Sequence, residues 1–362
     1  MRILSRYITK NVISGYLFIL FVFIGLYFVI DIFTTLSDIL KTKPPLMIVV
    51  NYYLYMLPLI FLRVAPFSLL ISTLYTFGEL NKNNEIISMR ASGISIIKIC
   101  FPVIFFALLA SFVTLYVQEK TLAPSQKKVE DIKLRYIKND KSSIGEEKNF
   151  AFPSKNTIFF ARKFIPKEGI LEDVTMFDED KNGNITKKSI AKKLSYSDGT
   201  WEGSDIIEYS LDSKGNIVGK PSHWLKREMP LEDSPHEIIA KQNVFSQFAS
   251  LKNLKKEITR LKRIGASSLL NNLVIDYHRK IADAFSHLFL IICILPFALE
   301  IKKRKVALSS LGTGFIFGFI YYLFTSFSIA LGKSSVILPI FSAWLAPLFF
   351  LTVGITGLFL VK

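Results

Sequence analysis

The sequence has little of what disulfide-stabilised or metal-binding proteins need. Its 362 residues include only two cysteines, Cys100 and Cys293, and both lie inside long apolar runs. None of its four histidines has a cysteine or histidine partner at metal-ligand spacing, and no Gly-rich phosphate-binding loop is present. We therefore predict no disulfide framework, no metal, no bound cofactor and no catalytic site, so any ATP hydrolysis would belong to a separate subunit.

Charged residues are also scarce over most of the chain. Residues 119–280 hold 30 of the 45 Lys/Arg and 23 of the 29 Asp/Glu. The other 200 residues therefore contain only 15 Lys/Arg and 6 Asp/Glu. Those other residues contain six apolar runs, each close to the ~20 residues that a membrane-spanning helix needs. We predict a polytopic α-helical membrane protein with six spans in a 3 + 3 arrangement, the first a retained anchor. The runs are residues 11–36, 46–77, 96–117, 281–299, 306–331 and 336–361.

The short connections between the runs predict the orientation. Eleven Lys/Arg lie on one side, at the two termini and in two connections, against only Lys41, Lys43 and Lys333 on the other. Because basic loops stay in the cytoplasm, both termini are expected there. The insert would then lie outside, in the periplasm of a diderm bacterium.

The insert is predicted to be mainly β. Four β-rich runs, separated by turn signals, suggest a jellyroll-like or similar fold. After them Leu251, Leu254 and Ile258 recur at helical spacing among basic residues, which indicates an amphipathic helix that packs on the β-domain or lies on lipid headgroups. We divide the chain into a first transmembrane half (1–118), the insert with this helix (119–275) and a second transmembrane half (276–362). The β-rich runs are residues 157–164, 171–177, 185–196 and 205–211.

The connection at residues 78–95 carries the clearest local signal. Polar and apolar residues interleave at helical spacing, and Gly93 can end a helix in a left-handed conformation. This predicts a short amphipathic helix on the cytoplasmic face that docks into a groove on a partner; the alternative is a solvated loop. The residues expected to carry the docking are Glu79, Glu85, Ile86, Met89, Arg90 and Gly93.

Ionisable residues lie within the apolar runs, among them Asp31 in the first, Arg63 in the second, and Asp283 and His287 in the fourth. Such groups are costly in hydrocarbon and usually face a cavity or a partner. With Lys41 and Lys43 near the outer mouth, Asp31 and Arg63 form a candidate site for a large anionic amphiphile. The alternative is that Asp31 and Arg63 pair with each other or reach the membrane surface.

The fifth run contains Gly314 and Gly318, a small-xxx-small spacing that lets helices approach closely. Contact with a partner subunit in the membrane and packing within this chain explain that spacing equally well.

Four stretches resemble the LptF/LptG permeases of the lipopolysaccharide export ABC transporter. ILSRYITKNVISGYLF resembles the family's lead into its first span, and GELNKNNEIISMRASGIS its coupling helix. GILEDVTMFDEDKNGNI with IAKKLSYSDGTW resembles its periplasmic jellyroll, and DYHRKIADAFSHLFLIICILPFAL its entry into span four. The order and topology match over nearly the whole chain, and the run from Asp31 to Asp38 is more LptG-like than LptF-like.

The resemblance implies a non-catalytic permease subunit in the bacterial inner membrane. It implies four partners: a second permease of this type, a dimer of an LptB-like ATPase, an LptC-like bridge protein and lipopolysaccharide; no nucleic acid is expected. Glu85, with Arg90 and Gly93, would contact the ATPase. The alternative is an ATPase-coupled mechanotransmission or scaffold protein that does not itself move lipid.

Overall fold

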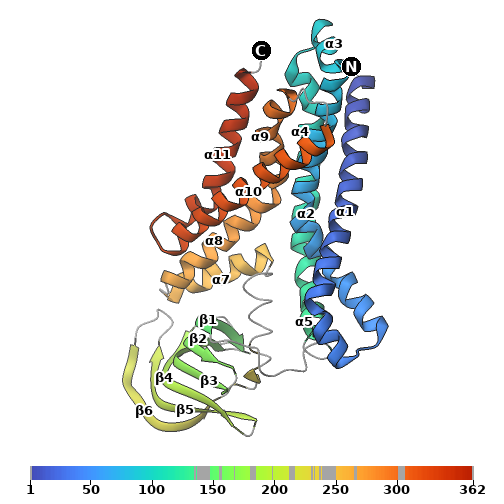
Figure 1. Cartoon of the computed structure of the whole chain (residues 1–362). Coiled ribbons are helices and arrows are strands. Elements are labelled where there is room, and N and C mark those ends of the chain that lie inside the picture. Colours follow the sequence, from blue (N-terminus) through green and yellow to red (C-terminus); the bar gives the residue numbers. More distant parts are fainter. Residues whose placement is uncertain are drawn as a thin grey trace. The chain divides into compact units, whose positions relative to one another are not determined.

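The computed structural model describes residues 2–133, 136, 147–154, 157–166, 168–179, 185–197, 199–211, 217–229, 231, 233–235, 238, 250–264, 267–300 and 306–360 (Figure 1). The chain forms two compact units. The helical unit comprises Met1–Ser37, Val49–Gln126 and Ser250–Lys362, and the second unit comprises Asp38–Ile48 and Lys127–Ala249.

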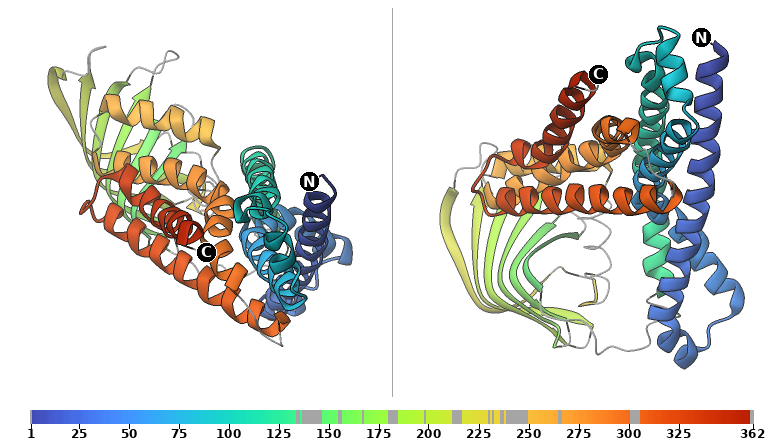
Figure 2. Two further views of the ribbon diagram at one scale, coloured as in Figure 1. Left: turned by 90° about the horizontal axis from the view of Figure 1, so that it is seen from above. Right: turned by 45° about the horizontal axis from the view of Figure 1, so that its top comes forward.

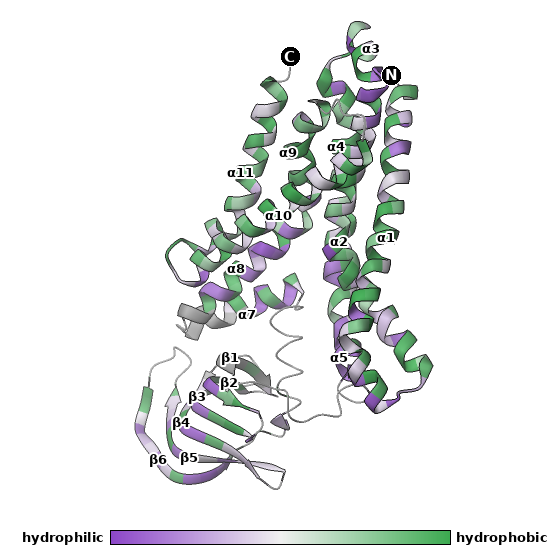
Figure 3. Ribbon diagram, viewed as in Figure 1, coloured by the Kyte–Doolittle hydropathy of each residue, from purple (hydrophilic) through white to green (hydrophobic). Residues whose placement is uncertain are grey.

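The helices follow the apolar runs of the sequence (Figure 3). A π-helical turn at Gln118–Leu122 joins α4 to α5, so that these two helices form one continuous rod. The helices are α1 (Arg2–Thr42), α2 (Leu46–Lys82), α3 (Glu85–Ala91), α4 (Ile96–Val117), α5 (Ala123–Ile132), α7 (Leu251–Ile264), α8 (Ser267–Ala284), α9 (Ser286–Glu300), α10 (Val306–Lys333) and α11 (Pro339–Leu360).

Within the described residues, five helices are long and apolar enough to cross a membrane, and a sixth span results if α8 and α9 count as one. Five of the predicted runs correspond to α1, α2, α4, α10 and α11. The fourth run, at 281–299, covers the end of α8 and most of α9, and the chain bends by 53° between Ala284 and Ser286. Hydropathy reports how apolar a segment is but not where its axis breaks. The 3 + 3 division of spans stays a prediction.

One hydrophobic core joins both halves of the helical unit. Its fully buried members come from α1 (Ile8), α2 (Leu69), α4 (Cys100) and α9 (Ile291), although these lie up to 283 positions apart in sequence. Cys293 is buried in the same core. Both cysteines therefore act as small apolar side chains.

Close packing of α10 against α2 depends on two glycines. A methyl group added at Gly314 would lie 2.6 Å from Cγ1 of Ile71, and one added at Gly318 would overlap the ring of Phe67. The glycines thus make room on α10 for side chains of α2 within this chain, as small residues do in membrane proteins. Gly312, on the same helix, has nothing within 4 Å of its added methyl group.

The second unit contains a six-stranded antiparallel sheet in which each strand pairs with its neighbours in sequence, and Figure 2 shows its strong curvature. One face is buried, with Phe159, Val174, Leu194 and Trp201 fully covered. The Trp201 indole donates a hydrogen bond to the carbonyl of Asp233 at 2.8 Å. The strands are β1 (Glu147–Ser154), β2 (Thr157–Ile165), β3 (Ile170–Glu179), β4 (Ile185–Ser197), β5 (Thr200–Leu211) and β6 (Ile217–Met229).

The four predicted β-rich runs correspond to β2–β5, whereas β1 and β6 were not predicted. Strand β6 contains Gly219 at φ +82° and Pro221, residues that weaken a strand pattern and are tolerated at a sheet edge. A jelly roll has crossing connections between strands. The described strands instead form a consecutive meander, so they do not confirm the predicted jellyroll-like fold, which stays a prediction.

The glycine contact generates a paired test. Gly314→Leu should destabilise the helical unit by about 1–3 kcal/mol, since the new side chain must displace Ile71 and Leu70. Gly312→Leu adds the same side chain to the same helix in open space and should leave stability unchanged or slightly higher. Thermal unfolding of the purified protein in detergent compares the two. Equal melting temperatures would show that α10 does not pack tightly on α2.

Candidate functional site

The candidate site is built on α3, which follows α2 after a sharp turn. Asn84 makes the turn in a left-handed conformation, with φ 58°. At the other end, the N–H of Gly93 donates to the carbonyl of Arg90 at 2.9 Å, and that of Ile94 to the carbonyl of Met89 at 3.2 Å. With Gly93 at φ +79°, these bonds make a Schellman motif, which confirms the predicted glycine stop.

The helix is shorter than the predicted segment of residues 78–95. Gly78–Lys82, including Glu79, belong to the last turns of α2, and α3 has only seven residues. The sequence pattern could not separate the two helices because hydrophobic spacing continues through the turn, from Leu80 to Ile86 and Ile87.

The two faces of α3 have different tasks. Ile86 is 4% exposed and Met89 8%, and both pack in the core of the helical unit. These two predicted docking residues therefore anchor α3 to its own chain. Glu85 is half-buried, whereas Arg90 and Gly93 are exposed. Ile87, which the sequence analysis did not single out, is 50% exposed and stands on the outer face.

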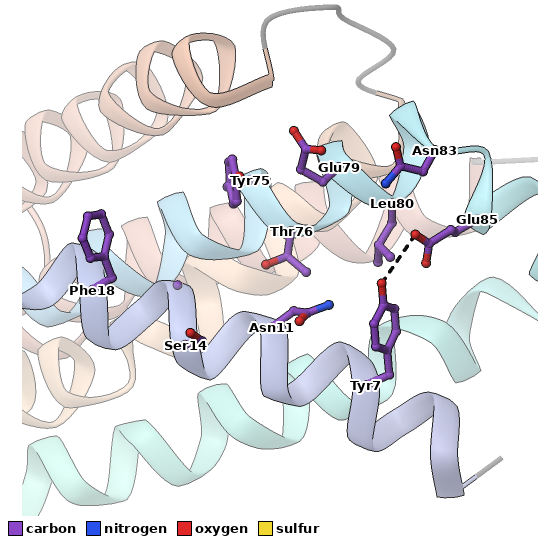
Figure 4. Close-up of a pocket in the computed structure, with 11 residues that line it drawn as sticks. Tyr7, Asn11, Ser14, Phe18, Tyr75, Thr76, Glu79, Leu80, Asn83 and Glu85 are labelled. Atoms are coloured by element: carbon purple, nitrogen blue, oxygen red, sulfur yellow. Dashed lines mark hydrogen bonds between the residues drawn. The ribbon is translucent and has the colours of Figure 1, made fainter.

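A pocket of about 430 Å³ opens beside α3, between α1 and α2 (Figure 4). The hydroxyl of Tyr7 points toward Glu85 and lies 3.4 Å from its Oε1. Glu79 forms an ion pair with Lys82 at 3.4 Å. Two carboxylates among hydroxyl and amide groups suit a cationic group better than an anion. The lining residues are Tyr7, Asn11, Ser14, Gly15, Phe18, Tyr75, Thr76, Glu79, Leu80, Asn83 and Glu85.

Asn81 connects this region to the second half of the chain, and the sequence analysis missed it. Its side-chain amide donates to the carbonyl of Ala298 at 3.0 Å and to that of Leu299 at 2.6 Å. Both carbonyls lie in the last turn of α9, where helical carbonyls have no partner within their own helix. The side chain is buried, at 6% exposed. Only a signal linking positions 217 residues apart could have revealed this contact.

The predicted anion-binding residues belong to both units: Asp31 and Arg63 to the helical unit, Lys41 and Lys43 to the second. Arg63 is exposed near the middle of α2 and donates a hydrogen bond to the hydroxyl of Tyr27 at 3.0 Å. In the described part of the chain it forms no ion pair with Asp31, so the predicted alternative of direct pairing is not seen. Lys41 lies in the last turn of α1, and Lys43 follows it at φ 46°.

Among the described residues, no group of three or more His, Cys, Asp or Glu side chains could hold a metal ion. His287 is fully buried in α9, and neither of its ring nitrogens has a hydrogen-bond partner within that part of the chain.

Two comparisons with known proteins bear on this chain. The sequence model of a family described as "Lipopolysaccharide export system permease LptF/LptG" matches residues 6–360. The chain is also similar to an uncharacterized protein of Rickettsia prowazekii (strain Madrid E), with 26% identity over 176 residues. That match covers 46% of this chain and 47% of the relative, so about half of each protein is compared.

The Asn81 contact can be tested with a neighbour as control. Asn81→Leu should lower the free energy of unfolding by about 1–3 kcal/mol, because it leaves two buried carbonyls at the end of α9 without donors. Asn83→Leu, at an exposed position one residue past α2, should change it by less than about 0.5 kcal/mol. Steric-trapping measurements of unfolding in detergent give both values. If the two variants are equally stable, the contact contributes nothing to joining the halves.

Proposed function

Because the chain belongs to the LptF/LptG family of lipopolysaccharide export system permeases, we propose that it is the transmembrane subunit that extracts lipopolysaccharide from the inner membrane for a periplasmic bridge. Members of this family are transport components without catalytic activity. The observation that carries the proposal is the family match over residues 6–360, on a chain with five or six apolar helices.

We propose that α3 couples this subunit to a separate ATPase dimer. A coupling element must be held rigidly by its own chain and present a surface to its partner. Burial of Ile86 and Met89 supplies the first property. The outer face, with Glu85, Ile87 and Arg90, supplies the second, since it combines an apolar side chain with charges of both signs. Such mixed patches suit a protein interface.

The Asn81 contact supports a route for motion from α3 into the second half. A displacement of α3 by the ATPase would move the end of α2, which precedes it in the chain. The two hydrogen bonds from Asn81 link that end of α2 to the last turn of α9. Movement of the ATPase would in this way shift both halves of the permease together.

The second permease and the bridge protein are proposed partners as well. Only 6% of the residues in the apolar stretch of α1 are buried within this chain, whereas 44% of those in the apolar stretch of α2 are buried. Helix α1 therefore offers a long apolar surface that lipid or the second permease would cover. The insert, taken as a periplasmic jellyroll, would contact the LptC-like bridge protein. The LptG-like character stays a prediction.

For the substrate we propose that Arg63, Lys41 and Lys43 attract the phosphates of lipopolysaccharide. Arg63 has five N–H donors, of which one bonds to Tyr27. An exposed guanidinium in a membrane-spanning helix is costly unless it faces a polar cavity or ligand. Asp31, the fourth residue of this proposed site, keeps one carboxylate oxygen, Oδ2, buried without a partner in the described residues.

Tagged purification from mild detergent, with mass spectrometry of proteins and lipids, tests the proposal. We expect a second permease, a small ABC ATPase and lipopolysaccharide to be recovered together. Charge reversal at Lys41 and Lys43 should reduce the lipopolysaccharide and leave the ATPase. An ATPase recovered without glycolipid would instead favour a mechanotransmission protein, and recovery of neither would refute the exporter.

Neighbouring isoleucines test the coupling role of α3. Ile87→Ala should lower affinity for the ATPase about fivefold or more, as loss of an interface hot spot does, with little effect on unfolding because the side chain is half exposed. Ile86→Ala should instead cost roughly 2–5 kcal/mol of stability, since it empties a buried position. Co-purification and thermal unfolding measure the two effects. Unchanged ATPase recovery with Ile87→Ala would exclude this face of α3 from the interface.

A further inference from the structure

Helix α7 is a strongly basic segment that the proposed function does not use. Its 14 residues, LKNLKKEITRLKRI, contain six Lys/Arg and one Glu. Figure 3 shows polar and apolar residues interleaved along it. Leu254 is fully buried, and Leu251 and Ile258 on the same face are partly buried. Helix α7 runs side by side with α8 (Figure 2), and we take these buried side chains to face it.

The exposed side of α7, next to its apolar face, carries three lysines. Lys252, Lys255 and Lys256 have the i, i+3, i+4 spacing that places side chains together on a helix. In the part of the chain that the structure describes, no carboxylate pairs with any of them. Among the side chains that the structure describes, these three positive charges have no carboxylate partner.

The start of α7 is fixed beside the end of a membrane span. The N–H groups of Leu251 and Lys252 donate to the carboxylate of Glu119, at 2.7 and 3.4 Å, and the N–H of Asn253 donates to the Ser250 hydroxyl at 3.2 Å. Glu119 lies in the π-helical turn that directly follows α4. These acceptors satisfy the first turn of α7 and hold it at the end of α4.

Helix α8, on which α7 packs, crosses the ends of two spans. Near its C-terminus, the Gln118 side chain donates to the carbonyl of Lys280 at 3.3 Å, which joins α8 to the end of α4. In its middle, Ile275 lies against Gly332, at the end of α10. Because α8 contacts the ends of both α4 and α10 before it bends by 53° into α9, the α7–α8 pair lies at one end of these two helices.

From this position and charge we infer that the lysine face of α7 binds the anionic phosphate headgroups of the bilayer's own glycerophospholipids. The apolar face is already used by α8, so the attraction is electrostatic and no side chain needs to enter the acyl chains. A helix of this kind would fix the level of the α8–α9 bend against the headgroup layer. The inference does not depend on lipopolysaccharide export.

The test uses the full chain in phosphatidylcholine nanodiscs that also contain phosphatidylglycerol. Native mass spectrometry counts the phosphatidylglycerol molecules that stay bound to the wild type and to two triple variants. The α7 variant carries Lys252→Gln, Lys255→Gln and Lys256→Gln. The control variant replaces three exposed lysines of the sheet: Lys192→Gln, Lys193→Gln and Lys220→Gln. Each lysine near an anionic surface contributes about fivefold in affinity. We expect at least about tenfold less bound phosphatidylglycerol in the α7 variant and no change in the control.

Two results would overturn the inference: equal phosphatidylglycerol on the α7 variant and wild type, or an equal loss in the control. A parallel set of nanodiscs with lipopolysaccharide distinguishes the source of phosphate, and a loss confined to lipopolysaccharide also refutes it. If the triple variant does not fold, a salt titration of the wild type decides. Binding to α7 should fall as salt screens the charges, and salt-independent binding would contradict it.

Discussion

A helix in lipid must satisfy its own backbone hydrogen bonds, and the features of the helical unit follow from that constraint. Wherever a helix ends or turns, another group has to replace the missing bonds. Gly93 closes α3 with a Schellman motif, and the Asn81 amide completes the last turn of α9. The Glu119 carboxylate does the same for the first turn of α7. Each replacement also connects segments that are far apart in the sequence.

These connections concentrate at the two ends of the spans, while the middle is held by apolar packing. Gly314 and Gly318 allow α10 to lie close to α2, and a single core includes residues from before and after the insert. Apolar packing of this kind resists separation of the helices, but it does not direct a movement of one helix toward a particular neighbour. The polar contacts at the helix ends, above all that of Asn81, give a movement at α3 a defined path to the second half.

Local patterns predicted local structure well. The apolar runs corresponded to the helices, four β-rich runs to β2–β5, and Gly93 to the end of α3. The helix bounds were missed where a pattern continued across a change of direction: the segment 78–95 is divided by the turn between α2 and α3. The bend between α8 and α9 likewise left no mark in the hydropathy of the fourth run. Ile86 and Met89 were assigned to docking because hydrophobic spacing identifies an apolar face and cannot tell which chain covers it. Strand β6 was missed because an edge strand tolerates proline and glycine.

The sequence by itself determined that the chain has helices apolar enough to cross a membrane, a β-rich insert and a basic helix after it, since these depend on hydropathy and short-range spacing. Only the tertiary structure decided which residues face inward. It placed Ile87 outside and Ile86 inside on one turn of α3, brought Asn81 to the end of α9, and joined Glu119 to α7. Such contacts span up to 218 residues, and the geometry of the packed helices creates them.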